Sequence, residues 1–245
     1  SWVSAINSQY RCVVVPGDNI KRIFLASGIK APIFSIHPSF YRHKRNLYED
    51  FEEEVFNLSF TIDNSSFSYF KMVLEVFCRI QKQIPELRLK VYIEMEVSDF
   101  EDIIAANEKN GVNYYRGFTI SSQFSDWYKE IHCNIYIAND QAFPFNPLES
   151  LYLGIPTLIN NTSSNDDLKK SGYFAVIDLE CKDNLSESPS DRDFNTILEA
   201  ILDIHSKYSA NYQLATKGAF WLEDKWLQID TEQEMLTILN AMDNS

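Results

Sequence analysis

The sequence predicts an α/β fold, namely a Rossmann-like, doubly wound parallel sheet followed by C-terminal helices. Three observations support this prediction. From residue 54 to residue 179, short apolar and β-branched runs alternate with segments of helical periodicity, which is the pattern of βαβ units. The 245 residues, of which 45% are hydrophobic, can form a core on both faces of such a sheet. After Glu180 the alternation stops and mainly helical patterns follow.

The predicted elements follow one another regularly. Strands are expected at 55–62, 87–95, 112–115, 134–138, 156–160 and 174–179. Helices are expected between them at 67–83, 100–109, 122–130, 147–153 and 166–170, and after a polar loop at 182–192 further helices are expected near 193–207, 209–219 and 231–242. Because βαβ crossovers are right-handed, the ligand crevice of this sheet should lie at the carboxyl ends of its strands.

A separate β-α unit precedes this alternation. Residues 11–15 are an apolar, β-branched run, and residues 18–27 place their apolar side chains on one helical face. A second extended piece at 32–36 leads into a polar stretch at 37–50, which is typical of a linker.

Charge and composition exclude several classes of function. The formal net charge of −13 repels nucleic acid on average, and the basic residues form no long cluster that would override this. The cysteines Cys12, Cys78, Cys133 and Cys181 form no CxxC pair, so we expect no metal site. No apolar run approaches the ~20 residues of a membrane span and no signal peptide is visible, which indicates a cytoplasmic protein.

The most informative segment runs from Phe143 to Asn161. Glycine-rich dinucleotide and phosphate-loop fingerprints are absent. Asn146-Pro147 is instead suited to the N-cap and first position of a helix that starts at the crevice. Such a helix start can hold a diphosphate, and Glu149 in its first turn can accept hydrogen bonds from a ribose. From local chemistry alone, a capped helix whose Glu149 complements the helix dipole is the more ordinary explanation.

The same segment resembles the C-terminal domain of retaining GT-B glycosyltransferases of the family-four, or group 1, type. That family carries a pattern like E-G-F-G-x-P-x-x-E-A-x-x-x-G-x-P-V-I, and residues 141–159 match it at the same spacing. The polar turn at 161–172 and the turn at 115–118 also resemble family features. The resemblance implies a tail of the acceptor domain with the interdomain connector at 1–40 and a donor-nucleotide domain with C-terminal helices at 41–245.

The resemblance also implies a role for each part of the site. Glu149 would bind the ribose, and Gln141 would lie near the transferred sugar as the catalytic-site residue. The helix start would hold the diphosphate and a turn would frame the base, through Asn146, Pro147, Leu148, Gly117 and Phe118. The donor would be a nucleotide-diphosphate sugar, and neither a metal nor another cofactor is required in this class.

Several residues depart from the family pattern. Gln141 replaces the glutamate that contacts the sugar, and it cannot carry charge. Asp63 and Ser68 stand where the family has the arginine and lysine that neutralise the diphosphate, which removes a major stabilisation of the leaving group. Lys71, one helical turn further on, is a candidate diphosphate contact, although a solvated helix-face lysine is the more ordinary role.

Two main functions follow from these residues. The first is a hexosyl-type glycosyltransferase (EC 2.4) that acts on a glycan or glycoconjugate acceptor in polysaccharide synthesis, in the cytoplasm or at the inner face of the membrane. The second is a catalytically inactive glycosyltransferase-like subunit that binds or stabilises a partner glycosyltransferase. The acceptor site would lie on an N-terminal domain mostly outside this sequence. A sugar-phosphate epimerase is disfavoured because no acid-base pair lies in the right region.

Overall fold

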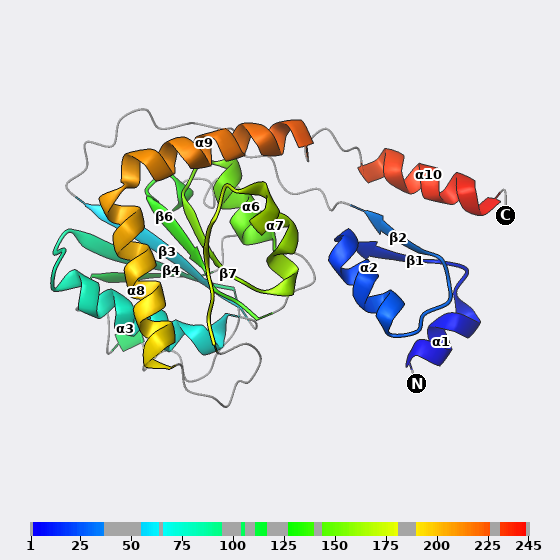
Figure 1. Ribbon diagram of the computed structural model, residues 1–245, viewed down its shortest axis with the longest axis horizontal. Coiled ribbons are helices and arrows are strands. Elements are labelled where there is room, and N and C mark those ends of the chain that lie inside the picture. The colour runs from blue at the N-terminus through cyan, green and yellow to red at the C-terminus, as the bar shows by residue number, and fades with distance from the viewer. Residues whose placement is uncertain are drawn as a thin grey trace.

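The computed structural model describes residues 2–36, 55–63, 66–94, 104–105, 111–116, 127–139, 144–180, 190–225 and 231–243 (Figure 1). Its main body is a six-stranded sheet flanked by helices, and a smaller two-stranded unit lies beside it. The predicted α/β, Rossmann-like class is therefore confirmed. The domain boundary proposed between residues 40 and 41 lies outside the described residues.

All neighbouring strands of the main sheet are parallel. The strands are β3 (Phe56–Ile62), β4 (Leu87–Ile93), β5 (Val112–Arg116), β6 (Cys133–Tyr136), β7 (Thr157–Asn160) and β8 (Ala175–Ile177). Their order is β5-β4-β3-β6-β7-β8, so the chain adds strands on one side of β3 and then returns to the other side. The point where the strand order reverses lies between β3 and β6, and open α/β sheets bind their ligands there.

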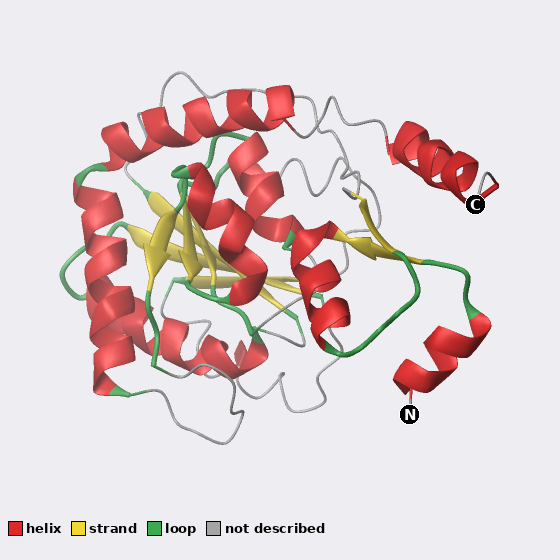
Figure 2. Ribbon diagram, turned by 45° about the vertical axis from the view of Figure 1, so that its right-hand side comes forward, coloured by secondary structure: helices red, strands yellow, loops and turns green. Residues whose placement is uncertain are grey.

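Helices cover both faces of this sheet (Figures 1 and 2). On one face α3 (Phe67–Gln81) packs beside α8 (Asp191–Ser206), and on the other lie α6 (Phe145–Tyr152), α7 (Asp166–Ser171) and α9 (Tyr208–Lys225). Alternating side chains of β6 enter the two cores, since Ile135 joins the first and Tyr136 the second. Strands buried on both faces are typical of parallel sheets.

Two local features hold these helices. Ser190 caps α8 by a reciprocal pair of hydrogen bonds with Asp193, whose backbone N–H donates to Ser190 Oγ at 3.1 Å. Gly218 allows α9 to approach α6 closely, because a Cβ there would lie 2.7 Å from Leu151 Cδ1 and 2.8 Å from Tyr173 Cβ.

The smaller unit is formed by the N-terminal residues. It contains α1 (Trp2–Gln9), β1 (Val13–Pro16), α2 (Gly17–Ala26) and β2 (Ile33–Ile36), and its two strands are parallel. Its core is formed by Val15, Ile29 and Ile33. The C-terminal helix α10 (Thr231–Asp243) contacts β2, and in both views it lies beside this unit rather than on the main sheet (Figures 1 and 2).

Most predicted elements are present, with shifted ends. β3, α3, β4, β5, β7 and α8 lie within a few residues of their predicted bounds. The helices predicted at 100–109 and 122–130 fall largely outside the described residues, where only 104–105 and 127–128 are described as helical. The helix predicted from Pro147 begins two residues earlier, at Phe145.

Candidate functional site

The candidate site lies at the carboxyl ends of β3, β4 and β6, around the start of α6. Asp63 follows β3 directly, Glu94 follows β4, and α6 is the first described helix after β6. These residues meet at one edge because the carboxyl ends of parallel strands share an edge. Tyr69 at the start of α3 also reaches this edge, where its hydroxyl donates to Asn139 Oδ1 at 3.0 Å.

Asp63 has a structural role in the turn between β3 and α3. Its backbone N–H donates to Ser66 Oγ at 2.9 Å, and its carboxylate accepts from the Ser66 N–H at 2.8 Å. Ser66 Oγ in turn donates to the Thr61 carbonyl oxygen at 2.8 Å. The aspartate therefore closes a tight turn by local hydrogen bonds of a kind that an arginine at the same position could not accept.

The start of α6 differs from the sequence prediction. Pro144 occupies the N-cap and offers no side-chain acceptor, so the prediction that Asn146 caps this helix is wrong. Asn146 is the second helical residue and Pro147 the third. Proline is tolerated there because N–H groups of the first turn have no partner within the helix. The amide of Asn146 turns instead to polar groups of the sheet.

A buried polar network lies under this helix start, formed by Ser59, Thr61, Tyr128, Asn134, Asn146 and Ser150. Asn134 Nδ2 donates to Asn146 Oδ1 at 2.8 Å and to Ser150 Oγ at 2.7 Å. Asn146 Nδ2 donates to Thr61 Oγ1 at 2.9 Å. Side chains from β3, β6 and α6 are thereby connected directly beneath the switch point.

Glu149 is the fifth residue of α6 and is half-buried, so the prediction that it lies in the first turn is wrong. Burial raises the pKa of its carboxyl to about 7, and the negative charge of Glu94 contributes to the same shift. The pKa of Glu94 is itself raised by loss of hydration and by the charge of Asp63. Three carboxyl groups therefore influence one another at this edge, and Glu149 changes between its protonated and ionised forms near neutral pH.

Two buried tyrosines border the same carboxyl groups. Burial raises the pKa of Tyr128 well above its usual value, with a further contribution from Glu149. Burial, Asp63 and Glu94 raise the pKa of Tyr136. Both phenols are therefore neutral and act as hydrogen-bonding groups rather than as bases.

The other predicted site residues do not all lie at this edge of the sheet among the described residues. Pro147 and Leu148 are buried, and the Leu148 side chain belongs to the core between α6 and the sheet. Lys71 is exposed on α3, and Ser68 is the second residue of that helix. Gln141, Gly117 and Phe118 lie outside the described residues, so their roles remain predictions.

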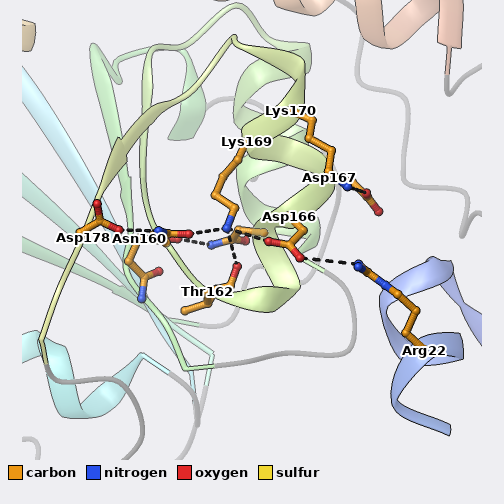
Figure 3. A network of polar contacts seen from close by, with 10 residues as sticks. Arg22, Asn160, Thr162, Asp166, Asp167, Lys169, Lys170 and Asp178 are labelled. Carbon is orange, nitrogen blue, oxygen red and sulfur yellow. Dashed lines mark hydrogen bonds and ion pairs between the residues drawn. The ribbon is translucent and has the colours of Figure 1, made fainter. Parts of the chain in front are cut away.

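A second polar cluster follows β7 and was not predicted as part of the site (Figure 3). Lys169 donates to Asn161 Oδ1 and forms an ion pair with Asp166 at 2.7 Å. The hydrogen bond from Lys169 to Asp166 lowers the pKa of that carboxyl. Arg22 of α2 reaches the same aspartate at 3.6 Å, which links the smaller unit to α7. The sequence signal was the polar turn at 161–172, whose lysine lies one helical turn after an aspartate.

His132 and Cys133 lie away from the site, as expected for residues without a nucleophilic role. The His132 Nδ1 accepts from the Asn57 N–H at 3.1 Å, and burial lowers the pKa of His132 to about 4. Burial raises the pKa of the Cys133 thiol to about 12. A protonated, fully buried thiol is not a nucleophile.

Neither a membrane-spanning helix nor a group of metal ligands is found in the described part of the chain. None of its helices is both long and apolar enough to cross a bilayer. Among the same residues, no three or more His, Cys, Asp or Glu side chains are arranged to hold a metal ion.

The fold is that of the GT-B glycosyltransferases of the group 1 type, as comparison with solved structures shows. The chain superimposes on the GtfA/B complex with a TM-score of 0.71 at 14% identity, covering 100% of this chain and 48% of that one. It superimposes on TarM with a TM-score of 0.72 at 14% identity, covering 98% and 45%. The chain thus spans about half the length of these structures.

A third similar structure is the pneumococcal O-GlcNAc transferase GtfA in complex with UDP and GlcNAc. Its TM-score is 0.66 at 13% identity, and the match covers 96% of this chain and 47% of that one. No protein-family model and no curated protein sequence matches the chain. The predicted fold resemblance is confirmed, and the predicted enzyme class agrees with these glycosyltransferase neighbours.

Proposed function

We propose that this chain is the donor-nucleotide half of a glycosyltransferase that transfers a sugar from a nucleotide-diphosphate sugar to a glycan or glycoconjugate acceptor. The observation that supports this most is the start of α6 near Glu149, at the switch point between β3 and β6, where the N-cap Pro144 makes no side-chain cap hydrogen bond. Phosphate groups bind at helix starts of this kind. A neighbour of the same fold is described in complex with UDP and GlcNAc.

The diphosphate would contact the backbone of the first turn of α6. The N–H groups from the N-cap to the third helical position have no acceptor within a helix. In α6 two of these four residues are prolines, Pro144 and Pro147, which carry no N–H. The donor that we assign is therefore the backbone N–H of Asn146, the second residue of α6. Pro147 and Leu148 shape the helix and its packing beneath this donor.

Glu149 would hold the ribose. An ionised carboxylate accepts two hydrogen bonds from vicinal hydroxyls, and a protonated one can still accept through its carbonyl oxygen. Because the pKa of Glu149 is about 7, binding should strengthen as the pH rises through this value and the carboxylate forms. Gln141 would hydrogen-bond the transferred sugar, Gly117 and Phe118 would frame the base, and Lys71 would approach the diphosphate.

A second function is favoured by Asp63. Its carboxylate is fixed in the β3-α3 turn, at the position where the family resemblance places an arginine. A negative charge there opposes the charge that develops on a departing diphosphate. This supports a subunit that binds nucleotide or a partner glycosyltransferase without turnover.

Calorimetric titration with UDP and GDP tests the donor site. We expect saturable binding of one nucleotide to the wild-type chain and a loss of at least about tenfold in affinity for Glu149→Ala, since it removes charge-assisted hydrogen bonds. Glu199→Ala is the matched control, because Glu199 is an exposed glutamate on α8 and its removal changes the net charge equally. Absence of binding, or equal binding by both variants, would contradict the donor site.

Turnover separates the two functions. Release of UDP from UDP-GlcNAc, measured with the full-length protein and with an excess of glycan acceptors, is expected for a transferase. Tight UDP binding with no release under any acceptor condition would assign the chain to the non-catalytic class.

A further inference from the structure

We propose that the buried polar network beneath α6 positions the first turn of this helix against the nucleotide diphosphate. Thr61, Asn134 and Asn146 are the positioning residues, and none of their side chains need touch the ligand. This inference rests on the proposed function, since the diphosphate contact is assigned to the backbone of the same turn.

Asn134 is the centre of the network and is fully buried in β6. Its Nδ2 donates to Asn146 Oδ1 at 2.8 Å and to Ser150 Oγ at 2.7 Å, while its Oδ1 accepts from Ser59 Oγ at 2.8 Å. Both donors of the amide and its acceptor are therefore used inside the protein. A network satisfied in this way fixes the geometry of its members.

Asn146 connects this network to the first turn of the helix. Its Nδ2 donates to Thr61 Oγ1 at 2.9 Å and approaches Tyr128 Oη at 3.3 Å. Ser150, one turn further on, donates to the Asn146 carbonyl oxygen at 2.9 Å. The second residue of α6 is thus connected to β3 and to β6, the two strands on either side of the switch point.

The chemistry of this contact favours positioning over packing alone. Polar side chains are costly to bury, and apolar side chains of similar volume often stabilise a core as well or better. The N-cap Pro144 supplies no side-chain acceptor to fix the helix start, so the network provides this restraint from the side of the sheet. Asn146 carries both the restraining amide and the proposed N–H donor.

Thr61 offers a nearly isosteric test. Thr61→Val removes the hydroxyl that accepts from Asn146 and leaves little cavity, whereas Thr61→Ser keeps the hydroxyl. The test compares the affinities of wild type and variants for UDP and for uridine, which lacks the phosphates. Thr61→Val should weaken UDP binding about five- to tenfold, the effect of one hydrogen bond, and leave uridine binding unchanged. Thr61→Ser should restore the wild-type ratio of the two affinities.

A purely structural role predicts a different pattern. It would lower the unfolding temperature and reduce UDP and uridine affinity in parallel, or change neither. Ser190→Ala, which removes the cap of α8 on the other face of the sheet, is the control for a loss of stability alone. It should leave the ratio of the two affinities unchanged.

Hydrogen exchange tests the positioning without any nucleotide. In the free protein, Thr61→Val should accelerate exchange of the Leu148, Glu149 and Ser150 amides about fivefold or more and leave α8 amides unchanged. If the wild-type chain binds no UDP but this acceleration is seen, the proposed donor site is ruled out. The inference that the polar network positions the first turn of α6 is then still supported. If exchange in α6 does not change, the positioning is overturned, whatever the affinity for UDP.

Discussion

At the scale of single residues, Glu149 is the group whose surroundings matter most for chemistry. Its carboxyl is partly withdrawn from water and lies near the charge of Glu94, and these two causes raise its pKa to about 7. An ordinary glutamate would be ionised throughout the neutral range. Glu149 instead titrates near neutral pH.

The raised pKa predicts how stability depends on pH. Since the folded-state pKa of Glu149 lies above its unfolded value near 4.5, the folded protein holds an extra proton between pH 4.5 and about 7. The contribution of Glu149 to stability is therefore favourable at low pH and falls as the pH rises through this window. After allowance for partial exposure, we expect a loss of about 1–2 kcal/mol.

Glu149→Gln removes this dependence. The difference in free energy of unfolding between variant and wild type, measured by urea denaturation at pH 5 and pH 8, should shift in favour of the variant by about 1–2 kcal/mol at pH 8. His132 titrates in an overlapping window but is present in both proteins, so its contribution cancels. A difference that does not change with pH would show that Glu149 is solvated normally.

At the scale of elements, the sheet and most helices could be predicted from the sequence, because hydrophobic periodicity is a local signal. The start of α6 could not. Asn-Pro is a good cap-and-first-position pair, but the amide of Asn146 finds partners on Thr61 and Asn134. Those residues lie 85 and 12 positions away in sequence, so no local pattern reveals them. The acidic clustering around Glu149 was missed for the same reason, since Asp63 and Glu94 come from separate strands.

The contact between α6 and α9 gives a prediction about Gly218. In a free helix, Gly→Ala stabilises by about 1 kcal/mol through propensity. Here the added methyl group would lie 2.7 Å from Leu151 Cδ1 and 2.8 Å from Tyr173 Cβ, so the helices must separate. We expect Gly218→Ala to destabilise the protein by about 1–3 kcal/mol, measured by urea denaturation. Ser209→Ala, at an exposed position of the same helix, is the control for propensity and should be neutral or stabilising.

At the scale of the whole molecule, the net charge of −13 acts against a nucleotide that is itself an anion. Backbone N–H groups and short hydrogen bonds are little affected by salt, whereas repulsion over distances beyond about 10 Å is screened. The proposed site combines short-range attraction with long-range repulsion. Its salt dependence should therefore differ from that of sites built on lysine and arginine.

UDP affinity should accordingly stay constant or rise, by up to a few-fold, when sodium chloride is increased from about 10 to 150 mM at constant pH. Calorimetry at pH 8, where Glu149 is ionised, gives the largest effect. A marked fall in affinity with salt would show that basic side chains, such as Lys71 or residues outside the described part of the chain, contribute more to the diphosphate contact than the backbone of α6 does.

The turn between β3 and α3 has a consequence for placing a basic side chain at position 63. Asp63 accepts the Ser66 N–H and, through its own N–H, holds the Ser66 hydroxyl. An arginine at this position would add the cation that the family resemblance places there and would at the same time remove the acceptor for the Ser66 N–H. The gain therefore requires a second, compensating change in the turn. The Asp63→Arg substitution alone would therefore leave the Ser66 N–H without its acceptor and open the turn.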